Sequence, residues 1–323
     1  MQCIRLEKQE YKSWDEFVES NYSGTIFHKA QWLENTDIEF EVYVIIENNQ
    51  VIAGAVFSYN SIFCKKIYQQ PVFTPYSGFV ITDSILKLKN TTNYSKIKKI
   101  KKEIFKICTI ECGKIFYSPY LDIDIHVEKW NGFNNSVSHT YVLSLNDIND
   151  VYNNFDGKRI KRLISKAKKD ESTIIEESKD IEIIINLSKL SFQRQKMQLN
   201  TYNVLKKLYK NCDNKAFICF NKKNDKPIAC SLIFYDSKRA YYLVGGYDYR
   251  NSNNYALTSC IWESIRTAFD LGLKEYDFEG TMLEKAEGQF RAFGGNLLPI
   301  VSVSKKLPVY YFNKVLREYF SIK

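Results

Sequence analysis

The sequence is poor in the side chains that build metal sites and hydrolytic triads. Its 323 residues include three histidines, His28, His126 and His139, which leave little raw material for a site of either kind. The eight cysteines form no C-x-x-C pair, and most lie in apolar runs, where a free cysteine behaves as a small hydrophobic residue. Cys108 and Cys112 are one helical turn apart, but no further ligand lies within sequence reach. We therefore expect reduced thiols and no metal.

Long apolar runs are also missing. No window approaches the roughly 18 uninterrupted apolar residues that a membrane span needs, and the charged N-terminus MQCIRLEKQEYKSW lacks the apolar core of a signal peptide. Neither a P-loop nor a dinucleotide-binding G-x-G-x-x-G is present. These absences predict a soluble, cytoplasmic protein without an integral membrane segment.

The charge is unbalanced toward cations. The formal net charge is +9, and much of it lies in KIKKIKK at 96–102 and KRIKRLISKAKK at 158–169. Apolar residues recur in both runs at helical spacing, which predicts helices with lysines on their outer faces. A solvated face is the simplest explanation. The excess also favours an anionic partner, which could be a phosphate-bearing donor, a nucleotide-linked acceptor, RNA or an anionic membrane surface.

The order of predicted elements indicates two copies of one α/β module. The run VIAGAVFSYN at 51–60 aligns with PIACSLIFYD at 227–236, and each follows a turn rich in Asn, Asp and Lys. Each run is followed by another strand, a helix, a glycine and an aromatic strand ending near an acid. A chain of this length also exceeds the usual size of one domain. We further expect a surface loop at PVFTPYSGFVI and one basic helical segment over 147–169.

The most informative stretch runs from Arg239 to Gly280. Apolar and amphipathic patterns predict a strand over 239–247, a helix over about 255–271 and a strand over 274–278. Such a β-α-β unit joins neighbouring parallel strands, and ligands collect at the carboxyl ends of those strands. A structural β-α-β unit whose glycines serve turns is the competing interpretation.

Several motifs then resemble the FemABX-like acyltransferases of the GNAT superfamily. The run Asp277-Phe278-Glu279-Gly280 followed by QFRAFGG at 289–295 resembles that family's D-F-E-G … F-[RK]-x-F-G signature. FHKAQWL, IYQQPVFTPYSGFVI and KRIKRLISKAKK resemble its entry helix, its Pro-Tyr-Gly loop and its basic helix, in the family's order. The helical hairpin inserted in some members is missing, so the chain resembles the compact form.

The resemblance implies an α/β (α+β) fold with two tandem GNAT-like lobes, each a mixed twisted sheet flanked by helices. The lobes would span 1–145 on the acceptor side and 146–323 on the donor side. It implies an acyl-CoA donor, such as acetyl-CoA, and an amine acceptor such as a nucleotide- or lipid-linked sugar. The loop after Arg250 departs from the GNAT phosphate pattern because it lacks glycine, which weakens the acyl-CoA assignment.

Site residues follow from this combination. Glu279 is favoured over Asp277 as the base, because it lies at the end of the predicted strand beside Gly280. A structural carboxylate, an ordinary β-bulge and a surface arginine remain competing interpretations. The other candidates are a backbone cradle for the acyl carbonyl at Val244, Gly245 and Gly246, donor-phosphate contacts at Arg250, Asn253 and Arg291, and substrate contacts at Lys29, Tyr76, Arg194 and Phe293.

The predicted function is N-acyl transfer from an acyl-CoA to an amine of an amino sugar or an amino-acid-bearing precursor of the cell envelope or of a polysaccharide. Two alternatives stay open. One is an aminoacyl-tRNA-dependent transferase of peptidoglycan bridge synthesis, for which tRNA would be a partner. The other is a catalytically silent binding module, which the glycine-poor phosphate loop allows.

Overall fold

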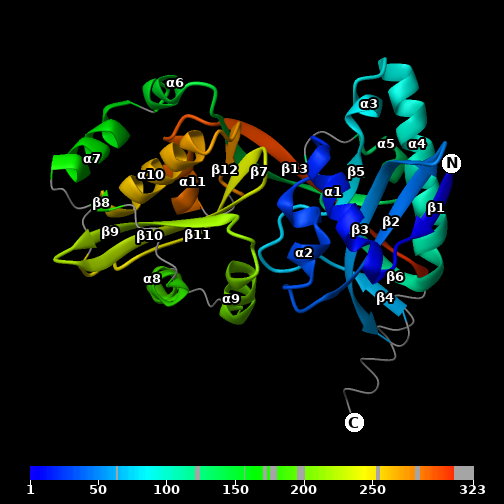
Figure 1. Cartoon of the computed structure of the whole chain (residues 1–323), viewed down its shortest axis with the longest axis horizontal. Coiled ribbons are helices and arrows are strands. Elements are labelled where there is room, and N and C mark those ends of the chain that lie inside the picture. The colour runs from blue at the N-terminus through cyan, green and yellow to red at the C-terminus, as the bar shows by residue number, and fades with distance from the viewer. Residues whose placement is uncertain are drawn as a thin grey trace, which may run out of the picture. The chain divides into compact units, whose positions relative to one another are not determined.

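The computed structural model describes residues 1–62, 65–120, 124–155, 157–169, 173–174, 180–194, 201–251, 255–280 and 284–308. The chain divides into two compact units, shown in Figure 1. The first unit comprises Met1–Ser138 and Pro299–Lys323, and the second comprises His139–Leu298. No helix of the described residues combines the length and the apolar character required to cross a bilayer.

The first unit is a mixed sheet with strand order β1-β2-β3-β4-β6-β13, and β5 pairs with β3. Its core lies between the sheet and the long helix α4. Its strands are β1 (Gln2–Arg5), β2 (Glu39–Glu47), β3 (Gln50–Ile62), β4 (Lys65–Tyr68), β5 (Gly78–Ile81), β6 (Cys112–Tyr117) and β13 (Asn296–Lys306), and its helices are α1 (Tyr11–Ser20), α2 (Ala30–Leu33), α3 (Asp83–Leu86), α4 (Asn90–Glu111) and α5 (His126–Trp130).

Alternation along β3 explains how the first sheet is covered. Ala53, Ala55 and Phe57 belong to the core cluster beneath α4, whereas a Cβ on the intervening Gly54 would lie 2.4 Å from the ring of Trp14 in α1. Successive strand residues point to opposite faces, so α4 and α1 cover different sides of the sheet. Gly54 lets the indole of Trp14 approach the backbone.

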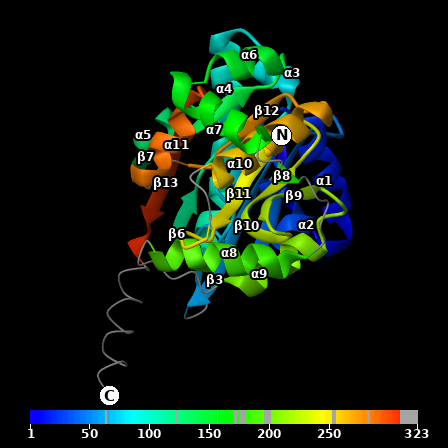
Figure 2. The same cartoon turned by 90° about the vertical axis from the view of Figure 1, so that its left-hand side faces the viewer.

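The second unit has strand order β7-β12-β11-β10-β9-β8. Helix α10 packs on β9 and β10, and α8 packs on β10 and β11, covering opposite faces of the strands in Figures 1 and 2. The elements are β7 (Asn134–Ser144), α6 (Ile148–Asn153), α7 (Gly157–Lys169), β8 (Thr173–Ile174), α8 (Ile181–Arg194), α9 (Tyr202–Lys210), β9 (Ala216–Lys223), β10 (Lys226–Tyr235), β11 (Arg239–Tyr247), α10 (Ala256–Asp270), β12 (Glu275–Asp277) and α11 (Glu284–Arg291).

The two units repeat one sequence of elements, as the aligned runs predicted. The hairpins β2–β3 and β9–β10 both turn on two residues with positive φ, Asn48 and Asn49 in one and Asn224 and Asp225 in the other. Asn and Asp tolerate this conformation, and such turns match the twist of hairpin strands. After each hairpin comes a third strand that pairs antiparallel with the second, and a helix then leads to a fourth strand that pairs parallel with the third. The third strand, helix and fourth strand are β4, α4 and β6 in the first unit and β11, α10 and β12 in the second.

The units differ in the third strand, the one that pairs with the second strand of each hairpin. In the second unit, β11 is continuous and carries a single bulge opposite Leu232 and Ile233 of β10. In the first unit, β4 and β5 pair with different parts of β3, and residues 69–77 separate them. This segment was predicted to be a surface loop, but Thr74, Tyr76 and Ser77 are buried in it. The prediction was wrong because the indole of Trp32 donates a hydrogen bond to Thr74 Oγ1 (3.0 Å) and draws the segment inward.

The basic segment 147–169, which was predicted to be helical, forms two helices. Helix α6 ends at Asn153 and α7 begins at Gly157, with Phe155 buried between them. The letters Asn-Asn-Phe-Asp-Gly contain four residues that favour turns. In α7, Ile160, Ile164 and Ala167 are buried, and the helix packs on α10.

Candidate active site in the second unit

Strands β11 and β12 part after three residue pairs. They run parallel, as predicted, and pair from Arg239 with Glu275 to Tyr241 with Asp277. β12 ends at Asp277, whereas β11 continues to Tyr247 in register with β10. In the described residues, the stretch of β11 from Tyr242 onward therefore has no partner strand on the side of β12. The backbone N–H and carbonyl of Tyr247 are bonded to Ser191 Oγ of α8, so the groups on that side that could hydrogen-bond a ligand carbonyl are those between Tyr242 and Gly246.

The bulge of β11 lies directly before the predicted cradle at Val244–Gly246. Ile233 pairs with Tyr242 and Leu232 with Val244, so Leu243 is the extra residue. A bulge bends its strand and increases the twist, which helps β11 to leave β12. A bulge was the competing interpretation of this cradle, and it occurs at Leu243, one residue before the predicted range.

The glycine pair after the bulge is required by packing on both faces of β11. A Cβ on Gly245 would lie 1.7 Å from Tyr242 Oη, and one on Gly246 would lie 2.4 Å from the backbone nitrogen of Ser188 in α8. Any side chain at Gly246 would push α8 away from the sheet. Gly246 therefore lets α8 lie against the unpaired part of β11, and Gly245 leaves room for the Tyr242 hydroxyl on the other face.

Glu279 lies two residues beyond the end of β12 in an unusual conformation. Its φ is +56°, a region that costs a non-glycine residue on the order of 1–3 kcal/mol. Its Oε1 atom is buried and has no hydrogen-bond partner within the described part of the chain. Burial, and then the negative charge of Asp277, raise the pKa of the Glu279 carboxyl well above its usual value. A carboxyl on a strained backbone, with one buried oxygen lacking a partner in the described residues and a raised pKa, is the type of group found at catalytic sites.

Asp277 is hydrogen-bonded. It is fully buried, and its Oδ1 accepts hydrogen bonds from Thr140 Oγ1 (2.6 Å) and from the backbone N–H of Glu279 (2.8 Å). The strand was predicted to reach Phe278, but it ends at Asp277, so strand alternation does not govern Glu279. Of the two carboxyl groups, Asp277 is held by the fold and Glu279 is the one with an oxygen lacking a partner.

A comparison with protein families identifies the domain that carries this geometry. Residues 157–287 match the family model described as an acetyltransferase (GNAT) domain. The predicted enzyme class, an acyltransferase of the GNAT superfamily, is thereby confirmed. No curated protein matches the sequence.

Solved structures share the fold of the whole chain. "Crystal structure of FemX" aligns with a TM-score of 0.75 and 14% identity over 97% of this chain and 99% of that chain. L-PGS from Bacillus licheniformis aligns with a TM-score of 0.53 and 9% identity over 98% and 97%. A tandem GNAT protein from the clavulanic acid biosynthesis pathway aligns with a TM-score of 0.52 and 7% identity over 94% and 98%. These likenesses confirm the predicted α/β fold with mixed sheets flanked by helices, and they confirm the FemABX-like resemblance at the level of the fold.

The start of α10 is where the GNAT domain would receive donor phosphates. Helix α10 has fifteen residues, and among the described residues no side chain caps its N-terminus, so its first N–H groups and its dipole favour an anion. Arg250 is exposed and lies 5.4 Å from the ring of Tyr249. Hydrogen bonds from Asn251 lower the pKa of Asp248. The Asp248 carboxylate therefore stays ionised beside this loop. Asn253 lies outside the described residues.

Arg291 belongs to a hydrogen-bonded cluster on α11. Its Nε donates to Glu287 Oε1 (2.8 Å) and to Tyr141 Oη (3.1 Å), and Tyr141 also donates to Glu287 (2.9 Å). The hydrogen bond from Tyr141, followed by that from Arg291, lowers the pKa of Glu287. The Arg291 side chain remains 66% exposed, so its guanidinium is accessible but already paired.

The remaining predicted contacts lie in different surroundings. Phe293 is fully buried and packs edge-on against Phe155 at 5.1 Å, which gives it a place in the core. In the first unit, the Lys29 ammonium pairs with Glu19, and Tyr76 is buried with its ring 4.8 Å from that of Tyr120. Arg194 ends α8, and its side chain lies outside the described residues.

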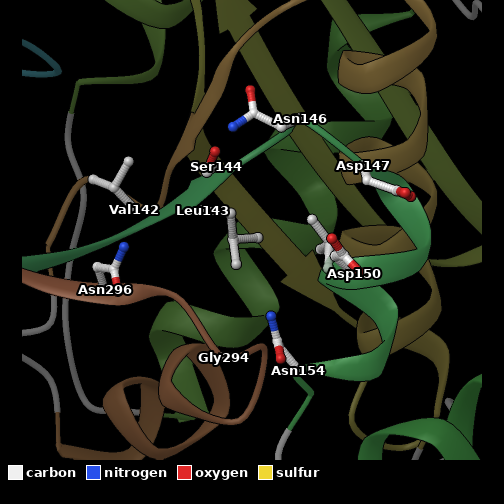
Figure 3. Close-up of a pocket in the computed structure, with 10 residues that line it drawn as sticks. Val142, Leu143, Ser144, Asn146, Asp147, Asp150, Asn154, Gly294 and Asn296 are labelled. Atoms are coloured by element: carbon white, nitrogen blue, oxygen red, sulfur yellow. The ribbon is translucent and has the colours of Figure 1, made fainter.

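A cavity of about 250 Å³ lies beside the glycine pair of the FRAFGG run. Figure 3 shows its lining from β7, the turn into α6, α6 itself and the segment at Gly294. Gly294 has φ +76°, and a Cβ there would lie 2.3 Å from the carbonyl oxygen of Asn154. None of the predicted site residues lines this cavity. It is formed where α6 packs against the signature segment, and we assign it no part in the candidate active site.

Sequence reasoning missed Thr140 and Tyr141, which lie on β7 and contact the signature residues. The alternating run HTYVLSL predicts a strand at this place. Its pairing with β12, more than 130 residues further along the chain, leaves no local sequence signal. The polar residue at an inward position, Thr140, was the only hint available.

Proposed function

We propose that the chain is an N-acyltransferase that moves an acyl group from an acyl-CoA to an amine, with Glu279 as the general base. The observation that supports this most is the buried Glu279 carboxyl, without a hydrogen-bond partner at Oε1, beyond the end of β12, where β11 and β12 have parted. A raised pKa makes this carboxylate a stronger base near neutral pH.

The chemistry requires one bond to form and one to break. The amine nitrogen attacks the acyl carbonyl, and Glu279 takes the proton that the nitrogen loses. The carbonyl oxygen, which gains negative charge, would be stabilised by backbone N–H groups of the unpaired part of β11 between Tyr242 and Gly246. The carbon–sulfur bond then breaks, and the departing CoA thiolate is protonated. Positioning the two substrates supplies much of the rate enhancement.

The donor phosphates would lie at the start of α10 with Arg250, and Arg291 is a second candidate contact. The acceptor class, an amino sugar or an amino-acid-bearing precursor of the cell envelope or of a polysaccharide, follows from the FemABX-like resemblance. Lys29 and Tyr76 in the first unit are proposed to face that acceptor. The division into an acceptor lobe and a donor lobe is part of the same proposal.

The basic face of α7 favours a second candidate donor, an aminoacyl-tRNA. Six of its lysines and arginines are exposed, and none of them forms an ion pair with a carboxylate in the described residues. The apolar side of α7 is buried, so no apolar residue is available for insertion into a bilayer. An array of free cations suits a polyphosphate chain. Its exposed members are Lys158, Arg159, Arg162, Lys166, Lys168 and Lys169.

Calorimetric titration with acetyl-CoA and with aminoacyl-tRNA distinguishes the two donors. An acyl-CoA enzyme should bind acetyl-CoA, and Lys158→Glu/Arg159→Glu/Arg162→Glu should leave that affinity within about twofold because α7 is not the phosphate site. An aminoacyl-tRNA enzyme should bind the tRNA with a steep salt dependence, and the triple substitution should reduce the salt slope by about three.

The control is Lys99→Glu/Lys102→Glu on α4, whose side chains are also exposed. It should leave the salt slope of tRNA binding unchanged if α7 is the contact. Binding of neither donor would contradict both forms of the proposal.

A further inference from the structure

The three residues after β12 are held by hydrogen bonds at every backbone N–H. The N–H of Phe278 donates to the carbonyl of Tyr141 (3.0 Å), and that of Glu279 donates to Asp277 Oδ1 (2.8 Å). The N–H of Gly280 donates to Thr140 Oγ1 (3.0 Å). A segment whose donors are all satisfied in one arrangement has little freedom to adopt another. The conformation of Glu279 is therefore fixed from β7 and from Asp277.

Thr140 links the two ends of this turn through one hydroxyl group. Its oxygen accepts the N–H of Gly280, and its proton is donated to Asp277 Oδ1 at 2.6 Å. The same Asp277 oxygen accepts the N–H of Glu279. Thr140 is 2% exposed and Asp277 is 0% exposed. Neither group is exposed to a substrate, so their effect on chemistry must pass through Glu279.

The turn holds Glu279 in a conformation that it would otherwise leave. Glu279 has φ +56°, and Gly280 beside it has φ +124°. Such backbone conformations persist only where the surroundings over-determine them. The hydroxyl of Thr140 is the one side-chain donor from β7 recorded for this turn in the described residues.

We propose that Thr140 is a positioning residue that holds the Glu279 carboxyl in its buried place. This inference rests on the proposed function for its catalytic meaning, because Glu279 is the proposed base. The structural effect does not depend on that catalytic role. Without the Thr140 hydroxyl, the turn relaxes and the Glu279 carboxyl reaches water. The titratable and charged side chains described on the elements around Glu279 are Glu275, Tyr276 and Asp277 of β12, His139 and Tyr141 of β7, Arg239, Tyr241, Tyr242 and Tyr247 of β11, and Glu287 and Arg291 of α11.

The test compares Thr140→Val, which keeps the shape and removes the hydroxyl, with Thr140→Ser, which keeps the hydroxyl. The pKa of Glu279 is followed by NMR with ¹³C-labelled glutamate, and the spectrum of Glu279→Gln assigns the signal. In Thr140→Val the pKa should fall toward the ordinary glutamate value of about 4.3, and in Thr140→Ser it should stay near that of the unmodified protein. An unchanged pKa in folded Thr140→Val overturns the proposal.

Hydrogen exchange of the unmodified protein keeps the proposal testable if Thr140→Val does not fold. The amide hydrogens of Glu279 and Gly280 should exchange far more slowly than those of exposed loop residues, because both are bonded in the turn. Rapid exchange at both amides would show that the turn is not held and would overturn the proposal.

Turnover separates this inference from the proposed function. With an acyl-transfer assay, Thr140→Val should lower kcat about tenfold or more, but it should add little to the loss already caused by Glu279→Gln, because residues acting through one group are not additive. An additive loss would contradict positioning through Glu279. An unaltered rate in Glu279→Gln would instead contradict the proposed base, while the pKa measurement would still decide the role of Thr140.

Discussion

At the scale of single residues, Glu279 combines three features that destabilise the folded state and that a purely structural residue would not need. It has a positive φ, a buried oxygen without a hydrogen-bond partner in the described chain, and a like-charged neighbour in Asp277. Each feature destabilises the folded protein when the carboxyl is ionised. A fold that keeps such a group is consistent with a catalytic role and with a trade of stability for activity.

This cost predicts a pH-dependent stability that Glu279→Gln removes. Because the pKa of Glu279 is raised by folding, the folded protein keeps a proton that the unfolded chain loses above about pH 4.3. The free energy of unfolding therefore falls as pH rises from that value through the raised pKa. Glu279→Gln lacks this step, and it should gain stability relative to the unmodified protein by roughly 1–3 kcal/mol between pH 4 and pH 8. Denaturant unfolding across this range measures the difference, and parallel stability curves for the two proteins would contradict the assignment.

At the scale of elements, α4 shows where a sequence pattern is insufficient. The lysine run 96–102 was predicted to lie on an outer face, but the Lys101 side chain is 0% exposed and its Nζ lies 2.7 Å from Glu128 Oε1 of α5. Tyr117 of β6 also donates to Glu128. Burial, only partly opposed by the negative charge of Glu128, lowers the pKa of Lys101. This buried ion pair ties α4 to α5 within the first unit.

Removing one partner of this pair should destabilise the protein more than removing both. Lys101→Met leaves Glu128 buried without its cation, and we expect a loss of roughly 3–5 kcal/mol in the free energy of unfolding. Lys101→Met/Glu128→Leu should recover most of that loss. Lys99→Met, at an exposed position of the same helix, should change stability by less than about 0.5 kcal/mol. A small effect of Lys101→Met in denaturant unfolding would show that the pair is not buried as described.

Elements with strong local signals could be predicted from the sequence. The hairpin turns at Asn48-Asn49 and Asn224-Asp225, the parallel β11–α10–β12 unit and the bulge near Val244 follow from local letters and spacing. Other features depend on distant partners. β1 and β13 were not predicted, the break between α6 and α7 was missed, and nothing near Asp277 indicates that Thr140 completes its hydrogen bonds. Such contacts are decided by tertiary packing, which a single sequence does not display.

At the scale of the whole molecule, one module occurs twice with different detail. In the second unit the third strand is continuous and bulged, and β12 leads to Glu279. In the first unit the corresponding strand is split into β4 and β5, and the position two residues beyond the end of β6, which corresponds to that of Glu279, is Pro119. The features that we propose for acyl transfer therefore lie in the second unit, which contains the residues that match the GNAT domain model. We propose that the first unit has been adapted to hold the acceptor.

The most direct test of this account is acyl transfer by Glu279→Gln. The assay follows acetyl transfer from acetyl-CoA, and aminoacyl transfer from aminoacyl-tRNA, to a panel of amino sugars and amino-acid-bearing precursors, with donor affinity measured by calorimetry. The account predicts that turnover falls by about 10²–10⁴-fold while donor affinity changes by less than about twofold, because a base acts on the acceptor nitrogen and does not bind the donor. A turnover equal to that of the unmodified protein would contradict it.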